Sequence, residues 1–194
     1  MNSKALIVFA KNIVLGKVKT RLAKDIGDEK ALEIYRALLN ETYEAAKDFK
    51  GKKFLFLSDF FDKNLFEASF AQIIQTGNDL GEKMKNAFEN IFQKNFQTAV
   101  IIGTDCPDLD LCIINEAFEK LFHYDIVIGP AKDGGYYLLG MKKPYNFLFE
   151  NIEWSNQNVL KETIKRIVEN KLSYYLLKEL SDVDEINDLM HFKF

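Results

Sequence analysis

The stretch that decides the fold is ALIVFA at residues 5–10, which runs directly into KNIVLGKVKTR at residues 11–21. A continuous apolar run without alternating polar residues is typical of a strand that is buried on both faces. Strands of this kind occur in parallel sheets that helices cover on both sides. The first 21 residues therefore predict a buried strand that ends in a basic loop.

The rest of the chain alternates between two periodicities. Apolar residues at helical spacing predict helices over 28–46, 80–92, 113–122, 159–169 and 184–190. Short apolar runs predict strands over 54–57, 99–102, 126–128, 136–139 and 174–177. This alternation favours an α/β sheet with helices on both faces. Because the strands at 126–128 and 136–139 lie so close in sequence, we expect them to form an antiparallel insertion.

Length and composition narrow the class of protein. A chain of 194 residues and 22.5 kDa fits one domain, which we take as residues 1–194. The net charge of −3 is too close to neutral for a nucleic-acid coat. Cys106 and Cys112 lack the spacing of a zinc or redox pair, and no run approaches the roughly 20 apolar residues of a membrane span. We expect a cytoplasmic protein with reduced cysteines and no nucleic-acid or membrane partner.

Ligands of α/β sheets bind beyond the carboxyl ends of the strands, so the segments after each strand are the candidate sites. The first loop carries four cations and one flexible glycine: Lys11, Lys17, Lys19, Arg21 and Gly16. Such a group suits a diphosphate, because cations neutralise its charge and backbone N–H groups hold its oxygens. The alternative is a solvated basic loop. Neither a Walker loop nor a Gly-x-Gly-x-x-Gly fingerprint is present.

The segment GNDLGE at 77–82 opens the third predicted helix. Asp79 stands three residues before Glu82, which predicts a capping-box-like start. Gly77 and Gly81 would also permit close approach of a base or phosphate. The structural and the nucleotide-binding interpretation can both hold.

Acidic residues follow two further strands. In GTDCPD at 103–108, we assign metal binding to Asp105 and helix capping to Asp108. Asp182 and Asp184 follow the strand over 174–177, and alternation on an extended segment predicts that only one of them faces a ligand. Capping of the last helix is the alternative role for this pair.

The segment GPAKDGGYY at 129–137 joins two strands. Asp133, Gly134 and Gly135 could form only a hairpin turn. The turn lies at the same sheet edge as Asp105, however, and paired glycines would let a sugar or another substrate sit against the backbone.

The order of these motifs along the chain resembles that of a known family, whereas no single motif identifies the family. FAK at 9–11, GKVKTRL at 16–22, DLGEKM at 79–84, GTDCP at 103–107, GPAKDGGYYLLG at 129–140, WS at 154–155 and DVD at 182–184 occur in one series. The chain thus resembles the glycosyltransferase-A-like family of small bacterial transferases. Some of its members are associated with radical-SAM proteins and arsenosugar biosynthesis. The family is related to the 2-phospho-lactate and molybdenum-cofactor guanylyltransferases.

The resemblance implies a nucleotide-diphospho-sugar transferase fold, an α/β/α sandwich around a mixed, mainly parallel sheet. It also implies that loop 11–21 wraps a nucleotide's phosphates, and that Asp105 binds metal together with Asp182 or Asp184. One departure is that Ile13 and Leu15 stand where the family usually has prolines, so the loop is less rigid.

The first functional expectation is a transferase that depends on Mg²⁺ or Mn²⁺ and uses a nucleotide-sugar donor. Lys17, Lys19 and Arg21 would hold the diphosphate, and Asp133 would position or deprotonate an acceptor hydroxyl. We count Asp133, Lys19 and Arg21 as candidate catalytic residues. The alternative is nucleotidyl transfer from a nucleoside triphosphate with release of pyrophosphate, and a third interpretation is a non-catalytic nucleotide-binding protein.

Overall fold

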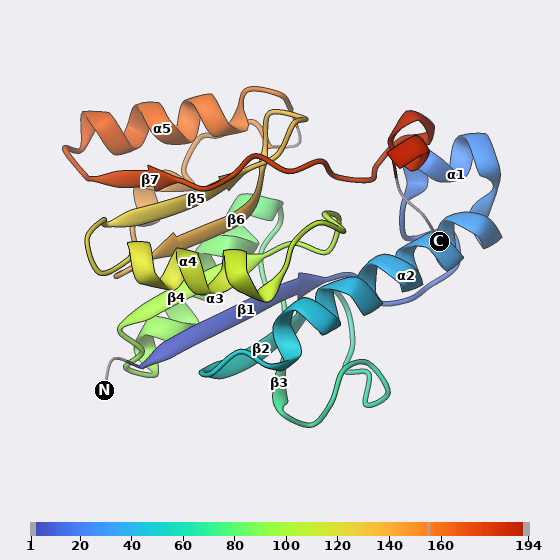
Figure 1. Cartoon of the computed structure of the whole chain (residues 1–194), viewed down its shortest axis with the longest axis horizontal. Coiled ribbons are helices and arrows are strands. Elements are labelled where there is room, and N and C mark those ends of the chain that lie inside the picture. Colours follow the sequence, from blue (N-terminus) through green and yellow to red (C-terminus); the bar gives the residue numbers. More distant parts are fainter. Residues whose placement is uncertain (1–2, 155, 192–194) are drawn as a thin grey trace.

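The computed structural model describes residues 3–154 and 156–191, and a seven-stranded sheet forms its centre (Figure 1). The strand order is β3-β2-β1-β4-β6-β5-β7. The strands are β1 (Lys4–Ala10), β2 (Lys52–Leu57), β3 (Phe70–Ile74), β4 (Thr98–Ile102), β5 (Ile126–Pro130), β6 (Tyr136–Met141) and β7 (Tyr174–Leu176). All pairings between these strands are parallel except those that β6 makes with β4 and β5. The sheet is therefore mixed and mainly parallel, with the predicted antiparallel insertion.

Helices cover both faces of this sheet. They are α1 (Thr20–Ile26), α2 (Asp28–Lys47), α3 (Leu80–Gln93), α4 (Leu111–Lys120) and α5 (Val159–Glu169), with short 3₁₀ turns η1 (Asn146–Leu148) and η2 (Ile186–His191). The helices α2 and α4 share one apolar cluster with the sheet, and α3 and α5 share the other. This three-layer α/β/α arrangement confirms the predicted fold class. Within the described ranges, no helix combines the length and apolar character that crossing a membrane requires.

The first strand shows why its sequence is continuously apolar. Leu6 and Val8 belong to one apolar cluster, and Ala5 and Ile7 belong to the other. All four side chains are fully buried. Because successive residues of a strand point to opposite faces, only an unbroken apolar run can serve both clusters.

The topology brings several loops to one edge of the sheet. The strands β1, β4 and β5 end at this edge, while the antiparallel β6 begins there. The segment that follows β7 reaches the same edge, since the N–H of Val183 donates to the carbonyl of Asp105 at 2.9 Å. A parallel bridge between Ala131 and Leu180 extends this contact. The C-terminal acidic segment is thereby held beside the end of β4.

Three elements go beyond the sequence predictions: α1, β3 and η1. α1 has only seven residues and one buried side chain, Leu22, so it has no helical stripe to detect. β3 is an edge strand in which only Phe70 is buried, so its sequence lacks a strong apolar pattern. The helix expected over 184–190 is the 3₁₀ turn η2.

Candidate active site

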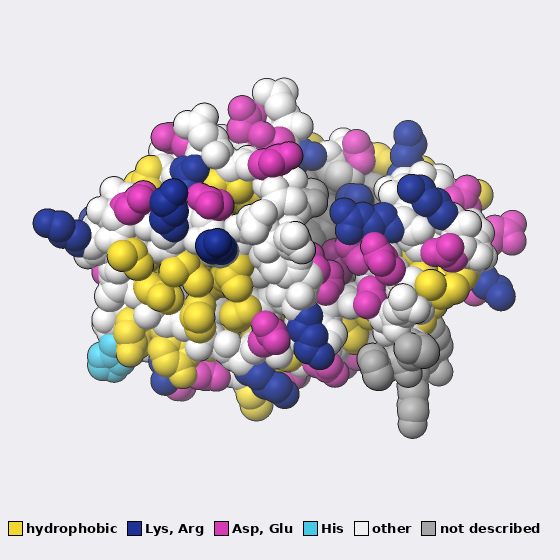
Figure 2. Space-filling model, turned by 90° about the horizontal axis from the view of Figure 1, so that it is seen from above, with side chains coloured by type: hydrophobic (Ala, Val, Ile, Leu, Met, Phe, Trp, Pro, Cys, Tyr) yellow, Lys and Arg dark blue, Asp and Glu magenta, His cyan; other side chains and the backbone are white. Residues whose placement is uncertain are grey.

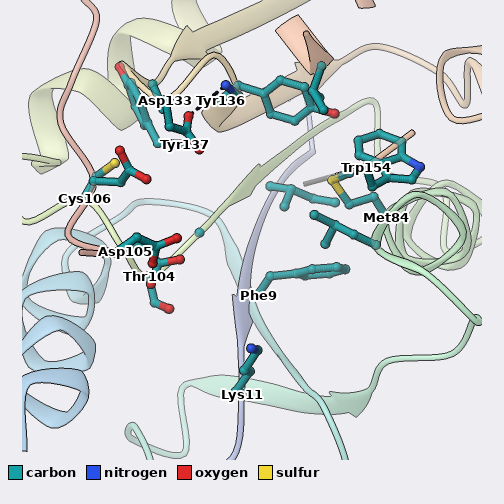
Figure 3. Close-up of a pocket in the computed structure, with 18 of the residues that line it drawn as sticks. Phe9, Lys11, Met84, Thr104, Asp105, Cys106, Asp133, Tyr136, Tyr137 and Trp154 are labelled. Atoms are coloured by element: carbon teal, nitrogen blue, oxygen red, sulfur yellow. Dashed lines mark hydrogen bonds between the residues drawn. The ribbon is translucent and has the colours of Figure 1, made fainter. Parts of the chain in front are cut away.

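A pocket of about 720 Å³ opens at the carboxyl edge of the sheet. Its walls come from the ends of β1 and β4, the start of α3, the β5–β6 hairpin, the segment before α5 and the C-terminal acidic segment. Figure 2 shows acidic and basic side chains side by side around a hollow on one face of the molecule. In Figure 3, Asp105, Cys106 and Asp133 lie on one side of the pocket, while Phe9, Met84 and Trp154 lie on the other.

The centre of the charged side is Lys19, whose ammonium group joins two carboxylates. Its Nζ donates to Oδ1 of Asp105 and, at 2.9 Å, to Oδ1 of Asp184. The Lys19 side chain is only 4% exposed, whereas those of Asp105 and Asp184 are 46% and 36% exposed. Burial by itself would lower the pKa of Lys19, but the charges of Asp105 and Asp184 outweigh it, and the net pKa is raised. Lys19 therefore stays charged and holds both carboxylates toward one point.

Local structure turns Lys19 inward. Its backbone is left-handed, with φ of 46°, and it immediately precedes α1. The neighbouring Val18 is buried and packs in the apolar cluster beneath the loop. A non-glycine residue in this conformation is uncommon and carries strain, which is often found at functional sites.

A second acidic pair lies beside the first. Burial, and then the charge of Asp133, raise the pKa of Asp182 to about 6. The thiol of Cys106 is buried, and this burial together with the charge of Asp182 raises its pKa. Both Asp182 and Asp184 line the pocket, so the expectation that only one of them faces a ligand stays a prediction. Val183, between the two acids in the sequence, is buried.

The positions of these carboxylates can be compared with those that a divalent cation requires. Within residues 3–154 and 156–191, no group of three or more His, Cys, Asp or Glu side chains is arranged to hold a metal ion. Asp105 and Asp184, however, already share one cationic atom, the Nζ of Lys19. Mg²⁺ commonly takes one or two carboxylates together with substrate phosphates and water. These two residues therefore fit a metal that arrives with a nucleotide, while Asp182 makes no such contact with Lys19 among the described ion pairs.

The first loop is held by residues that the sequence argument missed. Asn12 is 2% exposed, and its Oδ1 accepts hydrogen bonds from the N–H groups of Asp59 and Phe60, at 2.9 and 3.2 Å. The Tyr35 hydroxyl accepts from the Lys11 N–H at 2.8 Å and donates to its carbonyl at 2.9 Å. Burial, and then the charge of Asp105, raise the pKa of Tyr35. These contacts hold Lys11 and Asn12, at the start of the loop, in place.

The start of α3 is the predicted cap. The Asp79 carboxylate accepts from the Glu82 N–H at 2.8 Å, and the Glu82 carboxylate accepts from the Asn78 N–H at 2.8 Å. Gly81 is buried, and a Cβ there would come within 2.2 Å of the Trp154 indole. Gly81 therefore makes room for a tryptophan.

The β5–β6 connection is the hairpin turn that the sequence allowed. The Ala131 N–H donates to the Gly135 carbonyl at 3.1 Å, and the Asp133 carboxylate accepts from the Gly135 N–H at 2.8 Å. Gly134 has φ of 90°, and a Cβ there would lie 2.1 Å from the Gln157 carbonyl oxygen. The turn thus supports the segment before α5 and presents Asp133 to the pocket.

The predicted site residues divide into two groups. Those that line the pocket are Lys11, Lys19, Arg21, Asp79, Asp105, Asp133, Gly135, Asp182 and Asp184. Those that are not part of its lining are Gly16, Lys17, Gly77, Gly81 and Gly134. Helix capping by Asp108 is a wrong prediction, because Asp110 accepts from the Ile113 N–H at the start of α4. Ser155, which the motif series includes, lies outside the described residues.

Several apolar pocket residues carry no polar signature that the sequence argument could use. They are Phe9, Met84, Ile101, Tyr136, Leu139 and Trp154. Their patterns fit core positions equally well, so only the folded geometry identifies them as pocket lining.

Comparison with known structures places this fold among the nucleotide-diphospho-sugar transferases. A candidate nucleotide-diphospho-sugar transferase from Desulfovibrio desulfuricans G20 is 30% identical, with a TM-score of 0.91 over 97% of this chain and 85% of that one. The inositol-1-phosphate CTP transferase from T. maritima is 14% identical, with a TM-score of 0.60 over 97% of this chain and 92% of that one. A Mycobacterium tuberculosis H37Rv protein in complex with manganese is 14% identical, with a TM-score of 0.61 over 97% of this chain and 96% of that one.

The chain belongs to the bacterial family described as "Uncharacterized protein conserved in bacteria (DUF2064)", whose model matches residues 42–156. No curated protein matches it. The structural neighbours include nucleotide-diphospho-sugar and CTP transferases, which supports the expected class of enzyme, one of glycosyl or nucleotidyl transfer.

Proposed function

We propose that the protein transfers a sugar from a nucleotide-sugar donor to a hydroxyl group of a small-molecule acceptor, with a divalent cation at Asp105 and Asp184. The observation that carries this proposal is the convergence of Asp105, Asp184 and Lys19 in one pocket. The 30% identical neighbour described as a candidate nucleotide-diphospho-sugar transferase favours a sugar as the transferred group.

The donor's diphosphate belongs on the charged side of the pocket. Lys11 and Arg21 line it with exposed side chains, and Lys19 supplies a buried ammonium. Lys17 adds positive charge from the exposed loop, although it is not part of the pocket lining. When bound, Mg²⁺ or Mn²⁺ would neutralise part of the charge that develops on the leaving diphosphate.

The acceptor belongs beside Asp133. Its hydroxyl oxygen forms the new bond to the anomeric carbon of the sugar as the bond from that carbon to the diphosphate breaks. The hydroxyl proton passes to the Asp133 carboxylate, and the nucleoside diphosphate leaves with the bonding electron pair. The backbone of Gly135, which lines the pocket, would support the sugar in this step.

The test is to incubate the protein and Mg²⁺ or Mn²⁺ with nucleotide-sugars and, separately, with nucleoside triphosphates. Free nucleoside diphosphate is the expected product, whereas pyrophosphate would indicate nucleotidyl transfer instead. Asp105→Asn should abolish turnover. The control is Asp108→Asn, because Asp108 is an exposed carboxylate of the same turn that is not part of the pocket lining. Nucleotide binding without turnover of any donor would contradict the proposal and leave a binding protein.

A further inference from the structure

Aromatic and aliphatic side chains line one part of the pocket wall. Six side chains form it: Phe9, Met84, Ile101, Tyr136, Leu139 and Trp154. Met84, Ile101 and Leu139 are almost fully buried, whereas Phe9, Tyr136 and Trp154 are partly exposed. In Figure 3 the labelled members of this group, Phe9, Met84, Tyr136 and Trp154, lie apart from Asp105 and Cys106. We call this group the apolar compartment.

The sheet and its neighbours hold the compartment in place. Ile101 of β4 and Leu139 of β6 are direct cross-strand partners and form its floor. Phe9 stacks on Phe56 with ring centroids 5.6 Å apart, and Trp154 stacks on Phe149 at 6.3 Å. These contacts fix the aromatic rings before any ligand arrives.

Two glycines leave room for residues of the segment that carries Trp154. At Gly81 any side chain would collide with the indole, and at Gly134 any side chain would collide with the backbone of Gln157. The Leu160 N–H also donates to the Gly134 carbonyl at 2.9 Å. Trp154 is thus held against the start of α3, and Gln157 is held against the hairpin turn.

A phosphate-binding cluster alone does not account for an apolar wall. Partly exposed aromatic side chains in a concave site are usually covered by the apolar part of a ligand. This wall joins the hairpin that presents Asp133, since Tyr136 follows Asp133 by three residues and both line the pocket. The compartment therefore adjoins the hairpin that carries Asp133.

We propose that the apolar compartment binds the acceptor, and that the acceptor is an amphiphilic alcohol with an aromatic or alkyl body beside its hydroxyl group. This inference rests on the proposed function for the role of Asp133. The apolar body would pack between Trp154, Met84 and Phe9, which would direct the hydroxyl toward Asp133.

The test uses Trp154 itself, because it is the only tryptophan of the chain. Benzyl alcohol is titrated against glycerol while tryptophan emission is recorded, with and without a nucleoside diphosphate and Mg²⁺. We expect a saturable change with benzyl alcohol and at least tenfold weaker binding of glycerol. The absence of a saturable change, or equal affinity for the two alcohols, would overturn the inference.

Variants separate the compartment from a general effect on folding. Gly81→Ala should displace the indole and remove the preference for benzyl alcohol. Trp154→Ala should do the same when binding is measured by calorimetry. Val168→Ala is the matched control, because Val168 is 58% exposed on α5 and is not part of the pocket lining. Retention of the full preference in both Gly81→Ala and Trp154→Ala would contradict the proposal.

Competition identifies which substrate occupies the compartment. Uridine and guanosine diphosphates should bind together with benzyl alcohol, as should inorganic pyrophosphate. If the nucleoside diphosphates displace benzyl alcohol and pyrophosphate does not, the compartment holds the nucleobase and the acceptor assignment is wrong. Failure of the proposed function would instead be seen as a lack of donor turnover, which these binding measurements do not use.

Discussion

At the scale of single residues, Lys19 organises the charged side of the pocket. Its ammonium group is almost completely buried and compensates two carboxylates that remain partly exposed. A buried charge is tolerated when it is paired and hydrogen-bonded, and removal of one partner leaves the others uncompensated. Lys19 therefore keeps Asp105 and Asp184 close together despite their mutual repulsion.

Replacement of Lys19 by Met tests this role, because Met has a similar length but no charge. We expect the free energy of unfolding to fall by about 1–3 kcal/mol, toward the lower value because both carboxylates reach solvent. Mg²⁺ should then raise the melting temperature of the variant more than that of the wild type, since the cation can replace the ammonium. Equal melting temperatures for the two proteins, with equal responses to Mg²⁺, would show that Lys19 does not hold the pair.

At the scale of elements, the hairpin between β5 and β6 lines the pocket and also packs against the segment before α5. The turn presents Asp133 on one side and supports the segment before α5 on the other. Gly134 occupies a left-handed conformation with no room for a side chain, whereas Gly27 has a similar φ of 86° and open space around it. A comparison of the two glycines therefore separates the cost of backbone strain from the cost of a steric collision.

Gly27→Ala should cost only the strain of its conformation, about 1–3 kcal/mol. Gly134→Ala should lower the free energy of unfolding further, because its Cβ would collide with the Gln157 backbone, which must then move. Urea unfolding of both variants measures the difference. If Gly134→Ala is no less stable than Gly27→Ala, the segment before α5 does not rest on the turn.

Asp125 ties β5 to β7 at the end of the sheet. Its Oδ2 accepts hydrogen bonds from the Ser173 hydroxyl at 2.6 Å and the Ser173 N–H at 3.0 Å. These bonds lower the pKa of Asp125 below its usual 3.8. A pKa that is lower in the folded than in the unfolded protein stabilises the fold at pH values above the pKa of the unfolded chain. This contribution is lost as the pH falls through the pKa of the folded protein.

Asp125→Asn should therefore destabilise the protein by about 1–2 kcal/mol at neutral pH. The difference from the wild type should begin to shrink below about pH 4, near the pKa of the unfolded chain, and should be lost as the pH falls through the lower pKa of the folded protein. Urea unfolding at several pH values measures this. A difference that stays constant down to acidic pH would mean that the charge of Asp125 contributes nothing.

The elements also show how far sequence reasoning reaches. The buried strands and the long helices follow from their apolar patterns, because burial on two faces or along one stripe constrains those residues directly. Short or edge elements such as α1 and β3 bury few side chains, so tertiary contacts fix them rather than their own sequence. Capping by Asp110 rather than Asp108 shows the same limit, since both acids precede the helix and only its register decides between them.

At the scale of the whole molecule, the strand order assembles the charged residues of the pocket. Asp105 follows Lys19 by 86 residues and Asp184 follows it by 165, yet both carboxylates contact the Lys19 ammonium group. The sequence predicted each of them from its place after a strand, because polar residues at strand ends face the ligand edge. It could not predict the apolar compartment, since Met84 and Leu139 fit core positions equally well. It also could not show that Gly81 and Gly134 serve packing, because the presence of a glycine does not reveal which atoms lie against it in the folded protein.

If Asp105 and Asp184 hold a metal as we propose, metal binding and nucleotide binding should be interdependent. Neither Asp105 nor Asp184 alone forms a tight site for Mg²⁺, which relies on substrate phosphates for further ligands. A nucleoside diphosphate should therefore stabilise the protein more with Mg²⁺ than the separate effects predict. A ligand at 100 times its Kd stabilises the folded state by about 2.7 kcal/mol in total, and the excess is the part of this stabilisation that is absent without Mg²⁺. Asp105→Asn should remove this excess and leave the fold intact, because the side chain is 46% exposed.

Melting temperatures with Mg²⁺, with nucleoside diphosphate and with both measure the excess, and Asp108→Asn should behave as the wild type does. If Asp105→Asn retains the full excess, the metal-bound nucleotide is held elsewhere and Asp105 is only a partner of Lys19.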